Sequence, residues 1–263
     1  MKKTFKIIGI SLIWAATLAV EAAGGAALHP WQSSLEVGSA QAYFSNLKNG
    51  DTIETPYLVK FGLSGGWGLA PISSPSDAKS GHHHLLVNRE LPLDFKKPLP
   101  FNDEYIHFGK GQMETVLTFE PGTYSLRMLL ADDKHLPRFV YSKPIQITVK
   151  RKNAGVDPKS LLQKGISLVL DREVTKTPFR VQFHASALKV AHQSQKEQDT
   201  GHFRLTLLPK SSVKPVEFDF INGQTEVWLK PPAGDYVLKL EFLDNVNTGK
   251  LLTEAVMTSV QVQ

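Results

Sequence analysis

Cysteine is missing from the sequence altogether. Its absence excludes thiol nucleophiles, zinc sites built on thiolates and blue-copper centres, all of which need a cysteine sulfur. Attachment of a lipid at a lipobox cysteine is excluded for the same reason. Because no disulfide can form, an exported form of this chain must be stabilised by its core alone.

An excess of charge of one sign is missing as well. The whole chain has a net charge of +5. The first 22 residues hold three lysines and one glutamate, so the remainder carries 27 basic and 24 acidic side chains and a net charge of +3. This near balance gives no reason to expect nucleic acid or an anionic membrane as a partner.

Long apolar runs are scarce and confined to the amino terminus. Three lysines within the first six residues precede an apolar stretch from Ile7 to Val20, which is short for a membrane span. Val20 and Ala22 suit the two positions that a signal peptidase reads. We therefore expect residues 1–22 to be a secretory signal peptide of the Gram-negative type, with retention as an uncleaved anchor as the alternative. The mature protein is expected to be periplasmic or secreted and to have no membrane span.

The second half of the chain repeats the first in a weaker form. Short segments recur in the same order, namely Thr55–Phe61 and Thr177–Phe183, Gly81-His82 and Gly201-His202, Gly111–Glu114 and Gly223–Glu226, and Pro121–Leu126 and Pro232–Leu238. The last pair reads as having one inserted residue. The repeat predicts a first domain at residues 40–150, a linker at 151–163 and a diverged second domain at 164–263.

Within each copy the apolar residues alternate with polar ones, as in Tyr57, Val59 and Phe61. The alternating runs are short, rich in β-branched and aromatic residues, and bounded by turn dipeptides such as Pro121-Gly122. No convincing helical period extends beyond two turns. The pattern predicts an all-β protein made of two tandem immunoglobulin-like antiparallel β-sandwich domains that follow the signal peptide.

Motifs of the first copy are specific enough to indicate a family. They are Gly81-His82-His83-His84-Leu85-Leu86, His107-Phe108-Gly109-Lys110-Gly111-Gln112, Pro121-Gly122-Thr123-Tyr124 and Asp132-Asp133-Lys134-His135. With them, residues 42–149 resemble a bacterial family of unknown function, DUF4399, and residues 164–263 look like a diverged second copy. The resemblance implies an exported protein of this fold and carries no activity with it.

The histidines of the first copy are candidate metal ligands. On a strand, His82 and His84 point to one face about 7 Å apart, while His83 points to the other. Two imidazoles at this spacing can reach one ion, and His107 or His135 could supply the next ligand. Imidazole ligands without thiolate suit Zn²⁺ or Cu²⁺.

The second copy serves as a comparison for these histidines. Only His82 keeps a counterpart, in His202; the other positions become Phe203 for His83, Arg204 for His84, Asp219 for His107 and Asn247 for His135. The fold therefore tolerates the loss of four imidazoles, and Phe203 indicates that His83 packs inward. We predict a cluster of the other four histidines that binds a metal. A polar ligand site without metal and a purely structural network are the alternatives.

Three more residues are candidates for supporting roles. Asp132 or Asp133 could orient an imidazole or supply a carboxylate oxygen. Trp67 lies in the long loop at residues 64–80 and is a candidate for a binding surface, although half-buried packing would also explain it. The preceding Gly62–Gly66 segment has the Gly-x-Ser-x-Gly pattern, but no helix or parallel sheet follows, so hydrolase chemistry is not expected.

These observations predict an exported, non-catalytic binding protein that holds Zn²⁺ or Cu²⁺ through the first domain. Hydrolysis would need an ion with an open position and a general base, and the sequence offers no such base. The alternative function is an interaction module of the cell envelope that binds a protein or a glycan and contains no metal.

Overall fold

A computed structural model of the chain describes residues 28–34, 40–73, 79–91, 94–211 and 213–263. The predicted signal peptide lies outside these residues. Within them the chain forms strands and one 3₁₀ turn, η1 at Pro158–Leu161. No helix in the described part is long and apolar enough to cross a membrane.

The first copy contains two facing sheets. One has the order β1-β3-β7 and the other the order β2-β10-β8-β5-β4, with β6 paired to β5 and β9 paired to β8. The strands are β1 (Ala42–Phe44), β2 (Thr52–Thr55), β3 (Tyr57–Leu63), β4 (Gly68–Leu69), β5 (Ser80–Val87), β6 (Tyr105–Phe108), β7 (Glu114–Leu117), β8 (Gly122–Ala131), β9 (Pro137–Tyr141) and β10 (Ile145–Lys152).

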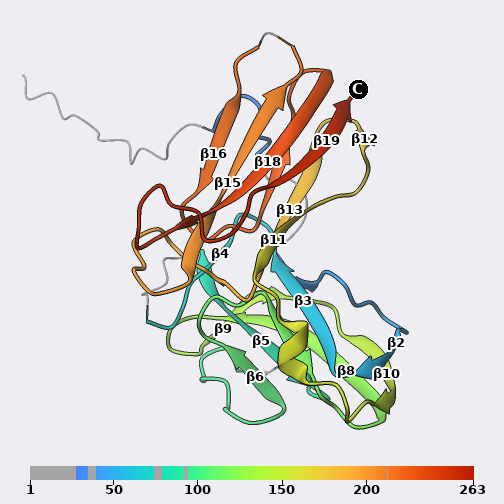
Figure 1. Cartoon of the computed structure of the whole chain (residues 1–263). Helices are drawn as coiled ribbons and strands as arrows, with labels where there is room; N and C mark the ends of the chain where they lie inside the picture. Colours follow the sequence, from blue (N-terminus) through green and yellow to red (C-terminus); the bar gives the residue numbers. More distant parts are fainter. Residues whose placement is uncertain (1–27, 35–39, 74–78, 92–93, 212) are drawn as a thin grey trace, which may run out of the picture.

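The second copy repeats this plan. Its sheets have the orders β11-β13-β17 and β12-β19-β18-β15-β14, with β16 paired to β15. The strands are β11 (Gly165–Leu170), β12 (Val174–Thr175), β13 (Phe179–Ser186), β14 (Lys189–Val190), β15 (Thr200–Pro209), β16 (Val216–Phe220), β17 (Glu226–Leu229), β18 (Gly234–Asp244) and β19 (Val256–Val262). Figure 1 shows the two copies one above the other, the second uppermost.

The two β-sandwiches confirm the predicted fold class, with one difference at the sheet edges. The central ladders are antiparallel, but the short edge strands β2, β4, β12 and β14 pair in parallel with their neighbours. These strands are two to four residues long. Strands of this length are too short to show an alternation of apolar and polar residues, so the sequence pattern did not predict their parallel pairing.

The strand registers confirm the alignment of the copies and correct it at one point. Tyr124 donates from its hydroxyl to the carbonyl of Glu120 at 2.9 Å, and Tyr236 donates to Pro232 at 2.8 Å. These are equivalent tyrosine corners, a feature of immunoglobulin-like folds. Tyr124 follows Gly111, and Tyr236 follows Gly223, by the same number of residues. The inserted residue predicted between the copies is therefore absent.

The copies contact each other through a pair of equivalent backbone hydrogen bonds. The N–H of Val190 donates to the carbonyl of Gly111 at 2.9 Å, and the N–H of Leu69 donates to Gly223 at 2.9 Å. At both glycines a side chain would overlap the facing carbonyl, and both have a positive φ, of 78° and 75°. The repeated glycine motif therefore allows this close approach. The contact has approximate twofold symmetry.

Two buried glutamates add to this contact. The carboxylate of Glu114 accepts from the N–H of Ala187 at 3.0 Å and the hydroxyl of Ser186 at 2.9 Å, and its Oε2 lies 3.0 Å from Nε2 of His184. The equivalent Glu226 accepts from the N–H of Gly65 at 3.3 Å. Each carboxylate thus reaches the other copy. Gly65 belongs to the Gly-x-Ser-x-Gly segment, which therefore takes part in the contact between the copies.

Candidate metal centre

Strand β5 divides the histidine run between two faces. His83 points into the sandwich, where it is fully buried and packs edge-on against Phe61 with ring centroids 4.9 Å apart. Phe203 occupies the same position in β15 and contacts Phe183 at 5.2 Å. The prediction that His83 is a packing residue is therefore confirmed. His82 and His84 point to the outer face of the sheet, with ring centroids 4.8 Å apart.

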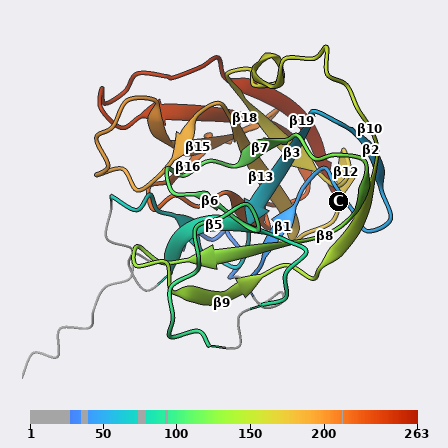
Figure 2. The same ribbon diagram turned by 90° about the horizontal axis from the view of Figure 1, so that it is seen from below.

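Neighbouring elements bring two more imidazoles to this outer face. In the pairing of β5 with β6, His84 lies directly opposite His107, and their rings stack at 4.9 Å. His135 lies in the turn between β8 and β9, with its ring centroid 5.1 Å from that of His82 and 4.9 Å from that of His107. Figure 2 shows β5, β6, β8 and β9 gathered on one side of the first copy.

The four imidazoles form one cluster that could hold a metal ion. One ring nitrogen from each of His82, His84, His107 and His135 lies within 4.8 Å of the other three. On a tetrahedral ion with bonds of about 2.1 Å the nitrogens lie about 3.4 Å apart, so the widest spacing must close by up to about 1.4 Å. Small ring rotations provide such a shift. The structure thus places all four predicted ligands together.

Some nitrogens of the cluster have no partner outside it in the described part of the chain. Nε2 of His82 lies 2.9 Å from Nε2 of His84. Nε2 of His107 and Nε2 of His135 are buried and have no hydrogen-bond partner among the described residues. Buried polar atoms are nearly always paired, by protein, water or an ion. Both nitrogens of His83 in the core are unpaired as well within the described ranges, so the feature that marks a ligand set is the convergence of four imidazoles within 4.8 Å.

Burial keeps the imidazoles neutral. Removal from water, with smaller contributions from neighbouring histidines, lowers the pKa of His82 to about 3 and that of His84 to about 2. Burial also lowers the pKa of His107 and that of His135. Neutral imidazole is the form that binds a metal, so the rings are ready to accept an ion without first losing a proton.

Features of the backbone hold His107 and His135 in place. Gly109 lies so close to the ring of His107 that a methyl group on it would overlap Nε2. His135 has a φ of 61°, in the left-handed region. The turn that imposes this conformation is organised by Asp132, whose Oδ1 accepts from the N–H groups of Lys134 at 3.0 Å and Leu136 at 2.8 Å. Asp132 therefore shapes the turn through backbone contacts.

The second copy has replaced this cluster by other interactions. Arg204 and Asp219 face each other as His84 and His107 do, and form a two-point ion pair with distances of 2.6 and 2.9 Å. His202 remains, and its Nδ1 lies 2.6 Å from Oδ1 of Asn245. Since these groups satisfy one another, the equivalent position of the second copy is a polar surface without a ligand set.

Sequence reasoning did not identify Phe101 and Gly109 as parts of the site. Phe101 is an exposed ring that contacts His107 and His135. The only sequence signal for it is that the loop before His107 is long in the first copy. Trp67, predicted as a possible surface residue, is partly buried and packs against the core. Its position is that of a packing residue.

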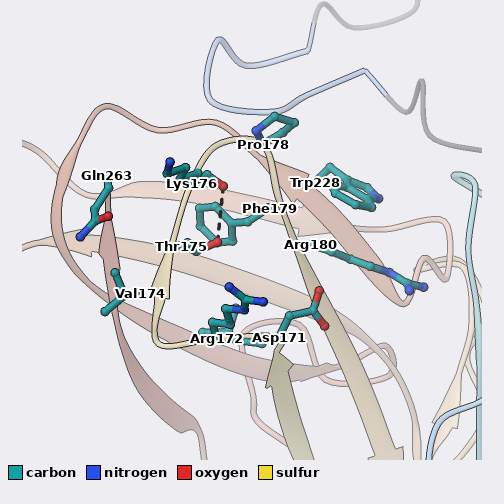
Figure 3. Close-up of a pocket in the computed structure, with 11 residues that line it drawn as sticks. Asp171, Arg172, Val174, Thr175, Lys176, Pro178, Phe179, Arg180, Trp228 and Gln263 are labelled. Carbon is teal, nitrogen blue, oxygen red and sulfur yellow. Dashed lines mark hydrogen bonds between the residues drawn. The ribbon is translucent and has the colours of Figure 1, made fainter.

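A separate hollow of about 690 Å³ lies in the second copy. Figure 3 shows Trp228, Pro178 and Arg180 around it, with Arg172 and Asp171 on the opposite side. Arg180 is already paired with Glu226, and its guanidinium lies 4.8 Å from the ring of Tyr43. Because Arg180 is already committed to Glu226, this hollow is a weaker candidate than the histidine cluster.

Comparisons with known proteins agree with the two-copy organisation. Residues 59–150 and 181–263 match the profile of a family described as a domain of unknown function (DUF4399). No curated protein is found to be similar in sequence. Among solved structures, fibronectin(III)-like modules of Clostridium thermocellum CbhA match 85% of this chain and 94% of theirs at 10% identity and a TM-score of 0.27. A two-domain fibronectin type-III segment of chicken tenascin matches 84% and 97%, at 12% identity and a TM-score of 0.26.

Proposed function

The chain belongs to the DUF4399 family, and from its histidine cluster we propose that it is an exported, non-catalytic protein that binds one divalent transition-metal ion. His82, His84, His107 and His135 supply four imidazole nitrogens, and the ion is Zn²⁺ or Cu²⁺, both of which accept such ligands. Four protein ligands leave no open position on a tetrahedral ion, which favours binding over hydrolytic chemistry.

The observation that carries the proposal is the convergence of four imidazoles, each with a ring nitrogen within 4.8 Å of the other three. A structural histidine is ordinarily satisfied by a backbone or carboxylate group, as Glu114 satisfies Nε2 of His184. In the cluster, Nε2 of His107 and of His135 have no such partner in the described part of the chain. An ion at the centre of the cluster satisfies both atoms.

The proposed export rests on the amino-terminal sequence. A basic segment followed by the apolar stretch at residues 7–20 supports secretion to the periplasm or beyond. Amino-terminal sequencing of the protein recovered from a periplasmic fraction tests this part of the proposal. Recovery only from the cytoplasm, with residue 1 intact, would contradict it.

Metal loading tests the proposed site. We expect the tag-free protein to bind one Zn²⁺ or Cu²⁺ ion per chain, measured by elemental analysis after gel filtration and by titration calorimetry. The His82→Ala/His84→Ala variant should lose about 100-fold or more in affinity, because two of four ligands are gone. For Cu²⁺, electron paramagnetic resonance should show nitrogen coupling that this variant lacks.

The matched control is His83→Phe. It removes an imidazole from the same strand, on the face that packs into the sandwich, and introduces the residue that the second copy has as Phe203. It should bind one ion with unchanged affinity. A wild-type protein that binds no ion, or equal binding by the double variant, would refute the metal function and leave the interaction module as the alternative.

A further inference from the structure

Within the described residues, the histidine cluster is more exposed on one side than on the other. His82 and His84 are 1% and 0% exposed and lie against the sheet, whereas His107 and His135 are half-buried. Behind the cluster is the sandwich core that contains His83 and Phe61. In the described part of the chain, the route to the four nitrogens therefore lies on the side of His107 and His135.

The ring of Phe101 covers that side. Its centroid lies 4.6 Å from that of His135 and 5.3 Å from that of His107, in both cases edge to face. The ring is 65% exposed, so burial in the core does not explain its position. The aromatic contacts of Phe101 within the described residues are with the two imidazoles at the open edge of the ligand set, and they call for another explanation.

The segment that carries Phe101 is fixed to the cluster and is special to the first copy. The N–H of Leu99 donates to the carbonyl of His135 at 2.9 Å, and the side chain of Leu99 is buried on the outer face of the sheet. The loop runs from residue 88 to 104, whereas the equivalent loop of the second copy runs only from 210 to 215. The long loop and the four imidazoles thus occur together in one copy.

We infer that the ion enters and leaves past Phe101, and that this ring sets the rate of metal exchange by shielding the His107 and His135 side from water and competing ligands. The inference rests on the proposed metal function and extends it: the centre is an exchangeable carrier site whose access is controlled by one aromatic side chain. An apolar cover over a metal site limits the access of solvent.

Release kinetics test this inference. The tag-free protein loaded with Zn²⁺ is mixed with an excess of a chromogenic chelator, and release is followed by stopped flow. Phe101→Ala should bind one ion and release it about tenfold faster or more, the scale on which groups around the ligands act. Phe101→Leu keeps an apolar cover and should stay close to the wild type.

The control is Met257→Ala, which removes an apolar side chain that is 61% exposed on β19 of the second copy. It should leave the release rate unchanged. A Phe101→Ala protein that binds one ion and releases it at the wild-type rate overturns the inference while the metal function stands. Absence of binding in the wild type would instead refute the metal function itself.

Discussion

At the scale of single residues, position on a strand decides what each histidine does. His83 and His84 are neighbours in sequence, yet one packs into the sandwich and the other joins the cluster on the outer face. The cluster also depends on a residue without a side chain. Gly109 leaves room for the ring of His107, whose Nε2 lies where a side chain at residue 109 would be.

Gly109→Ala should weaken metal binding without removing a ligand. The added methyl group overlaps Nε2 of His107, so the ring must move from its present place in the cluster. We expect a loss of about 10-fold to 100-fold in Zn²⁺ affinity, as for other groups that orient ligands, measured by competition with a chelator. Unchanged affinity in this variant would show that His107 is dispensable.

Acid should destabilise the metal-free protein. Burial lowers the pKa of His82, His83 and His84 to between about 2 and about 3, below the ordinary value of 6.5. The unfolded chain binds these protons at higher pH than the folded one, so the free energy of unfolding falls as pH drops through and below 6.5. Each histidine contributes up to about 1.4 kcal/mol per pH unit in this window. Urea unfolding between pH 7 and pH 4 measures the effect.

The His83→Phe variant provides the comparison for this pH dependence. The variant removes one of the three buried imidazoles, and its new phenylalanine ring occupies the core position that Phe203 occupies in the second copy. The slope of unfolding free energy against pH should become smaller in the acid range. An identical slope in the variant would mean that His83 does not remain neutral in the folded protein.

At the scale of elements, the site is formed by β5, β6 and the β8–β9 turn. The alternation along β5 predicted which histidines share a face, because the period of a strand is two. The choice of His107 and His135 as partners came from their place in motifs, and pairing with β5 explains the first of them. The role of Phe101 could not be predicted, because the path of an irregular loop has no sequence period.

Restoring the ligands in the second copy should create a second site. His202 is already present, and Arg204, Asp219 and Asn247 occupy the positions of His84, His107 and His135. The Arg204→His/Asp219→His/Asn247→His variant should raise the stoichiometry from one ion toward two, with the second bound more weakly for lack of the covering loop. A stoichiometry that stays at one would show that matching strands are insufficient.

At the scale of the whole molecule, the copies are held together by backbone contacts that two glycines permit. Sequence comparison identified Gly111 and Gly223 as a repeated motif, but not that each faces the other copy. That contact joins segments far apart in the chain, and no local pattern predicts it. The hydrophobic core accordingly includes residues of both copies in one cluster.

Gly111→Ala should destabilise the protein by about 1–3 kcal/mol or more, because a side chain is strained at positive φ and overlaps the carbonyl of Val190. Gly223→Ala should act similarly through Leu69. The control is Gly155→Ala, where the added group has nothing within 4 Å. Thermal and urea unfolding give the comparison; equal stability of all three variants would contradict the importance of this contact.

The two equivalent backbone hydrogen bonds between the copies, of Val190 with Gly111 and of Leu69 with Gly223, also bear on how the two-copy chain arose. An interface with approximate twofold symmetry inside one chain is what gene fusion of two identical, self-complementary subunits produces. After such a fusion only one half needs to keep the ligands, while both must keep the joining surface. The second copy fits this history, because it has kept the glycine and the glutamate of the joining surface and does not have the imidazoles.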